Sequence, residues 1–341
     1  FQIVFEWVLS DCEVVCMKID VAVPSYKKPE SLIYTLMTLK KVAGDLIDAV
    51  YINDDCSNDG SVEIYNDRRV REYFSPWKLN VRVNTRNVHI SQVYVPGYRV
   101  DYMDWKFMLT KWHRFIDPRV PHNRHDIRYQ YALDNTDKKY LLIIHDDVKF
   151  VKDVVSLYLK AFADNPNLAV AGDFGQCWRC RFAAVCSPKK IMSGFRPSRW
   201  WPLTPTSGEP ADFNPANGYT RACRINEWCC MVDVEKCRDV TERKRCFLGN
   251  MYKYSDTTAF WFGKMVECGY DFIDPLPSEA LPKQLARCPE HEEYYIHAWQ
   301  GHPGHSVWAD QGMGIVKYNR DEIVDLMKAE FGFDFPQKLI G

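Results

Sequence analysis

The sequence predicts an α/β fold, in which helices flank a mostly parallel sheet and a long insertion rich in Cys, Pro and Trp interrupts the second half. Three observations support this prediction. The apolar run at residues 141–144 does not alternate with polar residues, which is typical of a strand buried on both faces. Up to residue 175, such runs alternate with amphipathic stretches of helical periodicity, as in βαβ units. After Gly175 this alternation stops.

The first half of the chain is expected to contain five strands and three helices. In the helix expected at residues 31–42, Leu32, Leu36 and Leu39 share one face, and Pro29 stands near the start, where proline is tolerated. The expected strands are residues 19–26, 48–55, 77–84, 140–147 and 168–175, and the expected helices are residues 31–42, 101–116 and 151–165.

The second half is less regular. A loop as long as residues 176–226 inside a compact domain is usually functional or locally disordered. Regular structure is expected again at residues 227–237, as a helix at 256–270, a strand at 292–299 and a C-terminal helix at 319–332 that Asn319 can cap. The chain thus divides into an extension (1–16), a first half-domain (17–175), the insertion (176–226) and a second half-domain with the C-terminal segment (227–341).

Composition and charge exclude several classes of protein. The 341 residues carry a net charge of -1 and no long basic block, whereas a nucleic-acid-binding protein normally shows a basic face. No apolar run reaches the roughly 18 residues of a membrane span. The first sixteen residues lack a basic region and an A-x-A-like cleavage site, so a signal peptide is not expected. The thirteen cysteines are therefore expected to be reduced, in a cytoplasmic protein.

Polar residues follow three of the expected strands at their carboxyl ends. Ligands bind at this edge of an open parallel sheet, so these residues are expected to meet there. Two adjacent buried carboxylates require a positive partner. The alternative interpretation is that Asp146 and Asp147 only begin a turn and cap the next helix. The three groups are Pro24-Ser25-Tyr26, Asp54-Asp55 and His145-Asp146-Asp147.

These segments resemble a known family. The segments "VAVPSYKKPESLIYTLMTL" and "VYINDDCSNDGS" resemble the opening half-domain of GT-A fold glycosyltransferases, in particular the inverting family 2 group. The segment "IIHDDV" stands in the place of the family's D-x-D motif, and "YSDTTAFWFGKMVECGYDF" is similar to its E-D-x-[DE] segment on an acceptor-side helix. The resemblance covers residues 19–174 and, less specifically, 250–273. It implies that residues 17–175 bind a nucleotide-sugar and that residues 227–341 form the acceptor side.

The resemblance also implies an activity. A hexosyl or deoxyhexosyl group would pass from a UDP-, GDP- or dTDP-linked donor to a hydroxyl of a glycan or other acceptor, with inversion. Asp147 would bind Mn²⁺ or Mg²⁺, which stabilises charge on a departing diphosphate. His145 stands where the family often has aspartate, which leaves open which group contacts the ribose. The implied donor-binding residues are Pro24, Ser25, Tyr26, Asp54, Asp55 and Asp146.

The acceptor hydroxyl needs a general base, and the resemblance assigns this role to Asp256. Ser255 stands where the family has glutamate, and an aspartate here is also a favoured helix N-cap. Residues 291–308 contain four of the nine histidines, and the family frequently supplies a late histidine as a second metal ligand. His305 is preferred for this role, followed by His297.

The cysteines concentrate in and after the insertion. Cys177 and Cys180 form a C-x₂-C pair, the usual first half of a structural zinc site, and Cys186 with Cys223 is the preferred second half. The alternative is that these are reduced, partly buried thiols.

Two other functions compete with glycosyl transfer. A nucleotidyltransferase of related fold should have a Gly-rich basic first loop, but "PSYKKPES" contains no glycine. A non-catalytic module that binds a nucleotide-sugar or glycan would keep the fold without turnover. The sequence contains neither G-x-x-x-x-G-K-[ST] nor G-x-G-x-x-G, which disfavours a Walker-type NTPase and a dinucleotide-binding dehydrogenase.

Overall fold

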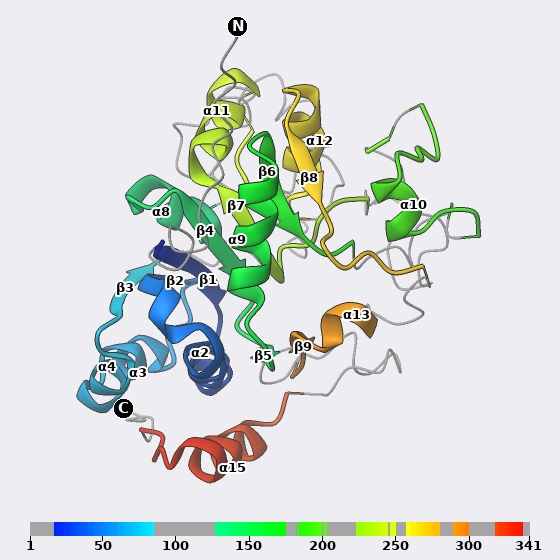
Figure 1. Ribbon diagram of the computed structural model, residues 1–341. Coiled ribbons are helices and arrows are strands. Elements are labelled where there is room, and N and C mark those ends of the chain that lie inside the picture. The colour runs from blue at the N-terminus through cyan, green and yellow to red at the C-terminus, as the bar shows by residue number, and fades with distance from the viewer. Residues whose placement is uncertain are drawn as a thin grey trace, which may run out of the picture.

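A seven-stranded sheet forms the centre of the molecule, with helices on both faces (Figure 1). Among the helices that can be described, none is both long and apolar enough to cross a membrane. The computed structural model describes residues 17–84, 127–174, 182, 184–199, 201–202, 223–244, 246–249, 257–279, 289–299 and 318–336.

The strands of the central sheet are β1 (Ile19–Ser25), β2 (Ile47–Asp54), β3 (Lys78–Val83), β4 (Tyr140–Ile144), β6 (Leu168–Gly172), β7 (Cys229–Asp233) and β8 (Asp271–Ile273). Their order is β3-β2-β1-β4-β7-β6-β8. Only β7 runs against its neighbours β4 and β6, and every other pair in this sheet is parallel. The mostly parallel, helix-flanked sheet that the sequence predicts is therefore confirmed.

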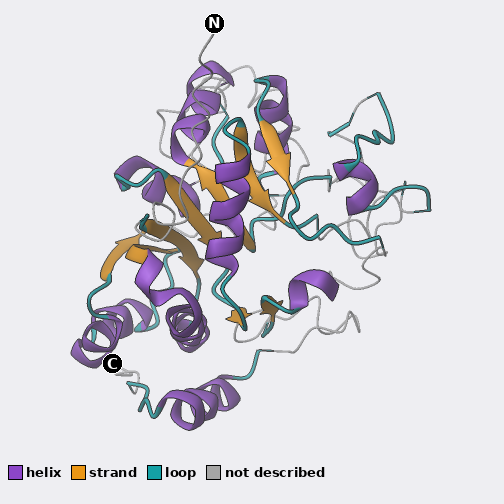
Figure 2. Cartoon of the chain, in the orientation of Figure 1, coloured by secondary structure: helices purple, strands orange, loops and turns teal. Residues whose placement is uncertain are grey.

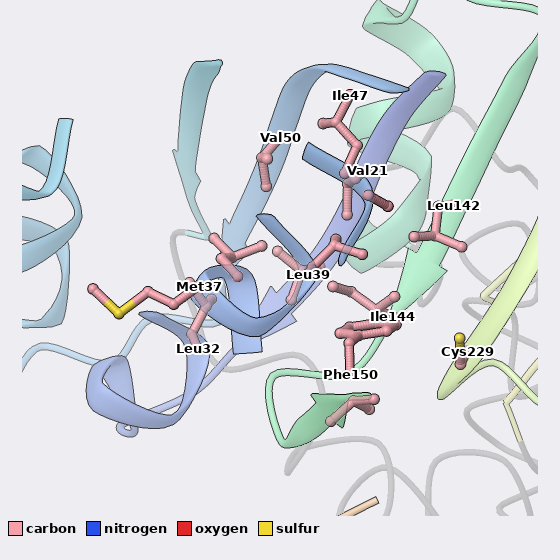
Figure 3. Close-up of a cluster of buried hydrophobic side chains, with 14 of the residues drawn as sticks. Val21, Leu32, Met37, Leu39, Ile47, Val50, Leu142, Ile144, Phe150 and Cys229 are labelled. Atoms are coloured by element: carbon pink, nitrogen blue, oxygen red, sulfur yellow. The ribbon is translucent and has the colours of Figure 1, made fainter. Parts of the chain in front are cut away.

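Helices lie on both faces of this sheet (Figure 2), and an apolar core fills each face. Along β1, Val21 and Val23 belong to one core and Ala22 to the other, because successive side chains of a strand alternate between faces. Figure 3 shows part of the first core, which includes Leu32 and Leu39 together with Val21 of β1 and Ile144 of β4. The helices of the first core are α2 (Pro29–Ala43), α3 (Ser61–Asn66), α4 (Arg68–Phe74), α9 (Val154–Asp164) and α15 (Arg320–Phe331); those of the second are α8 (Ile127–Asn135), α11 (Val234–Lys244) and α12 (Ala259–Glu267).

A second sheet joins distant parts of the chain. It consists of β5 (Val148–Phe150) and β9 (Tyr295–His297), which pair antiparallel with Val148 opposite His297. The backbone N–H of Val148 donates to Thr35 Oγ1 on α2, and the N–H of Phe150 donates to Thr38 Oγ1, each at 3.1 Å. Since β5 follows β4 after only three residues, 145–147, this small sheet brings the late segment 295–297 to the end of β4.

Most expected elements agree with the structure to within a few residues. Helix α2 begins at Pro29, and the Asn319 side chain caps α15 by accepting from the N–H of Glu322. Three strands are shorter than expected by three residues or more, and of these the strand expected at 168–175 ends at Gly172. The strand expected at 140–147 ends at Ile144, because 145–147 turn into β5, and the strand expected at 292–299 is only β9, preceded by the short helix α13 (Pro289–Glu292).

Two expected segments, residues 101–116 and the insertion at residues 176–226, lie wholly or partly outside the described residues. The helix expected at residues 101–116 lies outside the described residues. Of the insertion, the described part contains a short helix, α10 (Pro188–Met192), which the Ser187 side chain caps by accepting from the N–H of Lys190.

Candidate active site

The ends of β2, β1 and β4 lie side by side, because these three strands are neighbours in the sheet and parallel. Ser25 is opposite Asp54 in the register of β1 and β2. The N–H of Asp55 donates to the carbonyl of Ser25 at 2.9 Å, which joins the first two loops. The structure therefore places the three polar groups that follow these strands at one edge of the sheet.

Asp146 and Asp147 share one buried cation, the ammonium of Lys28. Lys28 Nζ lies 2.6 Å from Asp147 Oδ2 and 2.9 Å from Asp146 Oδ1. Lys28 is the residue that precedes α2, so the start of this helix carries the cation to the end of β4. Ser31 Oγ, in the first turn of α2, also donates to the backbone carbonyl of Asp146 at 2.6 Å. The positive partner that two adjacent carboxylates require is thus part of the chain.

The two carboxylates respond differently to this environment. Burial raises the pKa of Asp146 to about 6, although Lys28 opposes the shift. Burial acts on Asp147 in the same direction, but Lys28 and His297 together outweigh it and hold the pKa of Asp147 well below its usual range. Burial would lower the pKa of Lys28, but the two carboxylates raise it above its usual value. At neutral pH Asp147 and Lys28 are therefore both charged.

Two histidines approach Asp147 on the side away from Lys28. His297 Nε2, from β9, lies 2.8 Å from Asp147 Oδ1, and the N–H of Ala298 donates to the Asp147 carbonyl at 2.7 Å. His145 Nδ1 lies 3.9 Å from the same Oδ1. The His145 and His297 rings are edge to face, with centroids 5.4 Å apart. One carboxylate and two imidazoles therefore converge.

This group has the composition of a metal site. One ligand atom each from His145, Asp147 and His297 lie within 4.8 Å of one another. Carboxylate oxygens suit Mg²⁺ and Mn²⁺, and imidazole nitrogens suit later first-row metals, so the mixed set favours Mn²⁺ over Mg²⁺. The residues present thus fit a divalent transition-metal ion. Asp147 and His297 were expected in this role from the sequence, but His145 was not.

Trp228 supports both histidines. Its ring lies against that of His297, with centroids 5.3 Å apart, and its carbonyl accepts from the N–H of His145 at 3.0 Å. Its indole Nε1 donates to Asp173 Oδ1 at 3.0 Å. Asp173, at the end of β6, is fully buried, and burial raises its pKa to about 6. A contact chain therefore runs from β6 through Trp228 to the histidines beside Asp147.

A buried ion pair lies on the other side of His145. Arg224 Nη2 donates to Glu227 Oε2 at 2.9 Å, and both side chains are buried. Glu227 Oε1 is 3.9 Å from His145 Nε2, and Arg224 Nε donates to Thr258 Oγ1 at 3.2 Å, directly before α12. This pair connects the histidine to the start of the helix expected on the acceptor side. Neither Arg224 nor Glu227 was expected to have a role.

The expected donor-binding residues have distinct environments. Asp54 is fully buried and accepts from both the N–H and the hydroxyl of Ser57, at 2.8 and 2.6 Å, so its carboxylate shapes its own loop. Asp55 Oδ1 accepts from Asn84 Nδ2 at 2.8 Å. Ser25 Oγ is hydrogen-bonded to Tyr65 OH at 2.6 Å. Pro24 lies opposite Asn53 in the register of β1 and β2, and Tyr26 follows β1 directly.

Both donor-side loops contain residues with backbone angles that L-residues seldom adopt. Lys27 has φ 58°, Cys56 has φ 62° and Asn58 has φ 49°. Such conformations cost of order 1–3 kcal/mol each and persist where the surrounding structure enforces them, often in ligand-binding loops. The hydrogen bond from the N–H of Lys27 to Ser57 Oγ, at 2.9 Å, holds the two loops together. The loop after β1 is thus bonded directly to the loop after β2.

Several expected site residues cannot be placed. Asp256, His305, Cys177 and Cys180 lie outside the described residues. Of the other two cysteines in the predicted zinc site, Cys186 is buried, and Cys223 Sγ accepts from Trp201 Nε1 at 2.9 Å. Within the described part of the chain, no group of three or more potential metal ligands includes a cysteine, so zinc has no support there.

Comparisons with known proteins give limited help. No family model and no curated protein matches the chain. The mannosyltransferase PcManGT from Pyrobaculum calidifontis, solved in complex with GDP-Man and Mn²⁺, is 15% identical with a TM-score of 0.43, over 76% of this chain and 54% of that one. S. aureus TarS 1-349 is 14% identical with a TM-score of 0.36, over 73% and 55%. The chain spans about half the length of each structure, and with TM-scores this low the function must be argued from the site itself.

Proposed function

We propose that this chain is a glycosyltransferase, which moves a sugar from a nucleotide-sugar to an acceptor hydroxyl with the help of a divalent cation. The observation that carries the proposal is the position of Asp147. Its carboxylate is buried at the carboxyl ends of parallel strands, between the Lys28 ammonium and the two imidazoles of His145 and His297. The alternative interpretation, a turn whose carboxylates only cap the next helix, would not require three nitrogen-bearing partners around Asp147.

The residues around Asp147 have separable roles in this proposal. Asp147 and His297, with His145 nearby, would hold Mn²⁺, which when bound supplies positive charge to a departing diphosphate. The loops that contain Pro24, Ser25, Tyr26, Asp54, Asp55 and Asp146 would bind the nucleotide and ribose. The donor is proposed to be UDP-, GDP- or dTDP-linked.

The acceptor side completes the reaction. Asp256 would remove the proton from the acceptor hydroxyl as that oxygen attacks the anomeric carbon, and a single displacement of this kind inverts the configuration. Asp256 directly precedes Thr257 and Thr258, and Arg224 binds Thr258. The Arg224–Glu227 pair would therefore help to hold the start of α12 in place relative to His145.

The test is sugar transfer or donor hydrolysis by the purified full chain, with UDP-, GDP- and dTDP-sugars and Mn²⁺. We expect release of a nucleoside diphosphate, its loss with EDTA, and a decrease of at least about 100-fold in Asp147→Asn, since metal stabilisation of the leaving group contributes several kcal/mol. Asp153→Asn is a matched control, because Asp153 caps α9 at the surface and asparagine caps equally well.

Other results would contradict the proposal. Release of pyrophosphate would instead indicate a nucleotidyltransferase. Binding of a nucleotide-sugar without turnover by any donor and acceptor would indicate a binding module. Equal activity of Asp147→Asn and the parent would exclude the proposed metal role.

A further inference from the structure

The cation beside the two carboxylates changes the charge of the proposed metal site. The side chains of Lys28, Asp146 and Asp147 are 8%, 10% and 4% exposed, so solvent screens them little. Together they carry a net charge of -1, where the two aspartates alone would carry -2. The adjacent ion pair of Arg224 and Glu227 adds no net charge. A metal ion arriving without a nucleotide therefore meets a site that is already half neutralised.

Lys28 and the histidines use different oxygens of the same carboxylate. Lys28 binds Asp147 Oδ2, whereas His297 lies at Oδ1, with His145 on that side. A metal ion held by Oδ1 and the imidazoles would thus sit across one carboxylate from a buried ammonium. The two like charges would repel each other in a poorly screened site.

We propose that Lys28 makes binding of the divalent cation dependent on the donor's diphosphate, an inference that rests on the proposed function. Without nucleotide, the ammonium holds Asp146 and Asp147 and weakens metal binding by repulsion. The diphosphate brings negative charge that compensates both cations, so metal and nucleotide bind together more strongly than either alone. Because such coupling is reciprocal, the metal strengthens nucleotide binding by the same factor.

The neighbouring lysine gives a matched comparison. Lys27 follows the same strand, but its ammonium lies over the Tyr26 ring, 5.2 Å from the centroid, and its side chain is partly exposed. No described ion pair joins Lys27 to Asp146 or Asp147, and the described lysine that pairs with both is Lys28. A general effect of positive charge in the loop would be seen in both lysine variants, whereas the proposed effect is specific to Lys28.

The test is calorimetric titration of Mn²⁺ into the full chain without nucleotide, followed by titration of GDP and of UDP with and without saturating Mn²⁺. We expect Lys28→Met to bind Mn²⁺ alone at least tenfold more tightly than the parent, and to show a correspondingly smaller effect of Mn²⁺ on nucleotide affinity. Lys28→Arg and Lys27→Met should stay close to the parent.

Removing Lys28 leaves two buried carboxylates together without a cation, which can prevent folding. A second pair of variants therefore tests the effect of Lys28 in a site that contains only one of the carboxylates. Asp146→Asn leaves the site with no net charge, and the double variant K28M/D146N returns it to -1. The double variant should therefore bind Mn²⁺ at least tenfold more tightly than Asp146→Asn. Near-ultraviolet circular dichroism checks the fold of each variant.

The outcomes separate this inference from the proposed function. If the parent binds Mn²⁺ with nucleotide but Lys28→Met and the double variant show no gain in Mn²⁺ affinity, the role of Lys28 is wrong and the glycosyltransferase proposal stands. If the parent binds neither Mn²⁺ nor a nucleotide under any condition, the proposed function itself fails. If the parent is an active transferase that never binds Mn²⁺, Lys28 serves in place of the metal and the coupling is wrong.

Discussion

Asp146 and Asp147 are adjacent in the sequence and both buried, yet their pKa values move in opposite directions. Asp147 has two close partners, Lys28 and His297, that favour its charged form, whereas Asp146 has Lys28 and a hydrogen bond from the Tyr26 backbone and also feels the charge of Asp147. Burial therefore dominates for Asp146 and is outweighed for Asp147. Of these two carboxylates, Asp146 is therefore the one whose ionisation opposes folding of the metal-free protein.

A prediction follows for Asp146→Asn. The folded pKa of Asp146, about 6, lies above the ordinary pKa of 3.8, so the folded state loses stability relative to the unfolded state as pH rises from about 4 through 6. Asparagine mimics the neutral form and avoids this loss. We expect the variant to be more stable than the parent at pH 7.5, by on the order of 1–2 kcal/mol, and the gain to disappear near pH 4.5.

Urea unfolding of the metal-free chain at the two pH values measures this difference. Asp153→Asn, at the surface, should show no pH-dependent gain. A variant less stable than the parent at pH 7.5 would mean that the ion pair with Lys28 outweighs the burial of Asp146.

Some residues of the candidate site could be predicted from the sequence, whereas others have no recognisable sequence pattern. Asp146 and Asp147 stand out as adjacent carboxylates after an apolar strand, and His297 belongs to a late histidine cluster. Lys28 could not be predicted, because a lysine before a helix is common. Its role becomes visible only in the fold, where the start of α2 lies beside the end of β4. Glu227 was equally hidden, since its charge matters only where Arg224 and His145 lie near it.

At the scale of elements, the small helix α13 positions the strand that carries His297. His291 Nε2 lies 2.7 Å from Asp274 Oδ1, and both side chains are buried. Asp274 follows β8 directly and also accepts from the N–H of Phe174 at 3.2 Å. The ion pair therefore holds α13, and with it β9, to the ends of β6 and β8.

This ion pair predicts a pH-dependent effect of Asp274→Asn. Burial lowers the pKa of His291, but its bond to Asp274 outweighs burial and raises the pKa above the ordinary 6.5. The pair thus contributes fully below pH 6.5, and its contribution is lost as pH rises through the folded pKa. We expect Asp274→Asn to lower the free energy of unfolding by about 3 kcal/mol at pH 5.5, and by less at pH 9.

The measurement is again urea unfolding, with Asp271→Asn as the control because Asp271 is exposed at the other end of β8. Loss of the same size at both pH values would show that hydrogen bonds to the backbone, rather than the charge on His291, account for the effect.

Elements were easier to predict than their arrangement. Apolar runs and helical periodicity locate β1, β2, β4 and α2, since both patterns are local. The antiparallel pairing of β7 with β4 and the pairing of β5 with β9 depend on partners 85 or more residues apart in sequence. For example, Ile144 and Cys229 are 85 positions apart, and Val148 and His297 are 149 positions apart. Local patterns contain no information about such pairings.

At the scale of the whole molecule, the last described helix, α15, is hydrogen-bonded to the first described helix, α2, and to strand β5. Tyr34 OH on α2 donates to Glu330 Oε1 on α15 at 2.9 Å, and Lys149 Nζ on β5 donates to the same oxygen at 3.0 Å. Arg320 Nε donates at 2.6 Å to Glu30, which is buried two residues after Lys28. Helix α15 therefore supports the two elements, α2 and β5, that flank the candidate metal site (Figure 1).

Deletion of residues 318–341 is expected to abolish cooperative folding. It removes four buried side chains, Ile323, Met327, Phe333 and Phe335, from the core on the α2 face. Burial of each is worth about 1.5–3 kcal/mol, so about 6–12 kcal/mol is lost, which is comparable with the whole stability of a typical domain. The truncated chain should therefore lose its near-ultraviolet circular dichroism signal and its sharp urea transition.

Two point variants show whether packing causes this loss. Ile323→Ala should cost about 2–5 kcal/mol because it leaves a cavity in the core, whereas Asp325→Asn, on the exposed side of α15, should change stability by less than about 0.5 kcal/mol. A truncated chain that unfolds cooperatively with the parent's urea midpoint would contradict the prediction. Because the truncation also removes Arg320 and Glu330, such a result would show that their contacts with Glu30, Tyr34 and Lys149 do not stabilise the fold either.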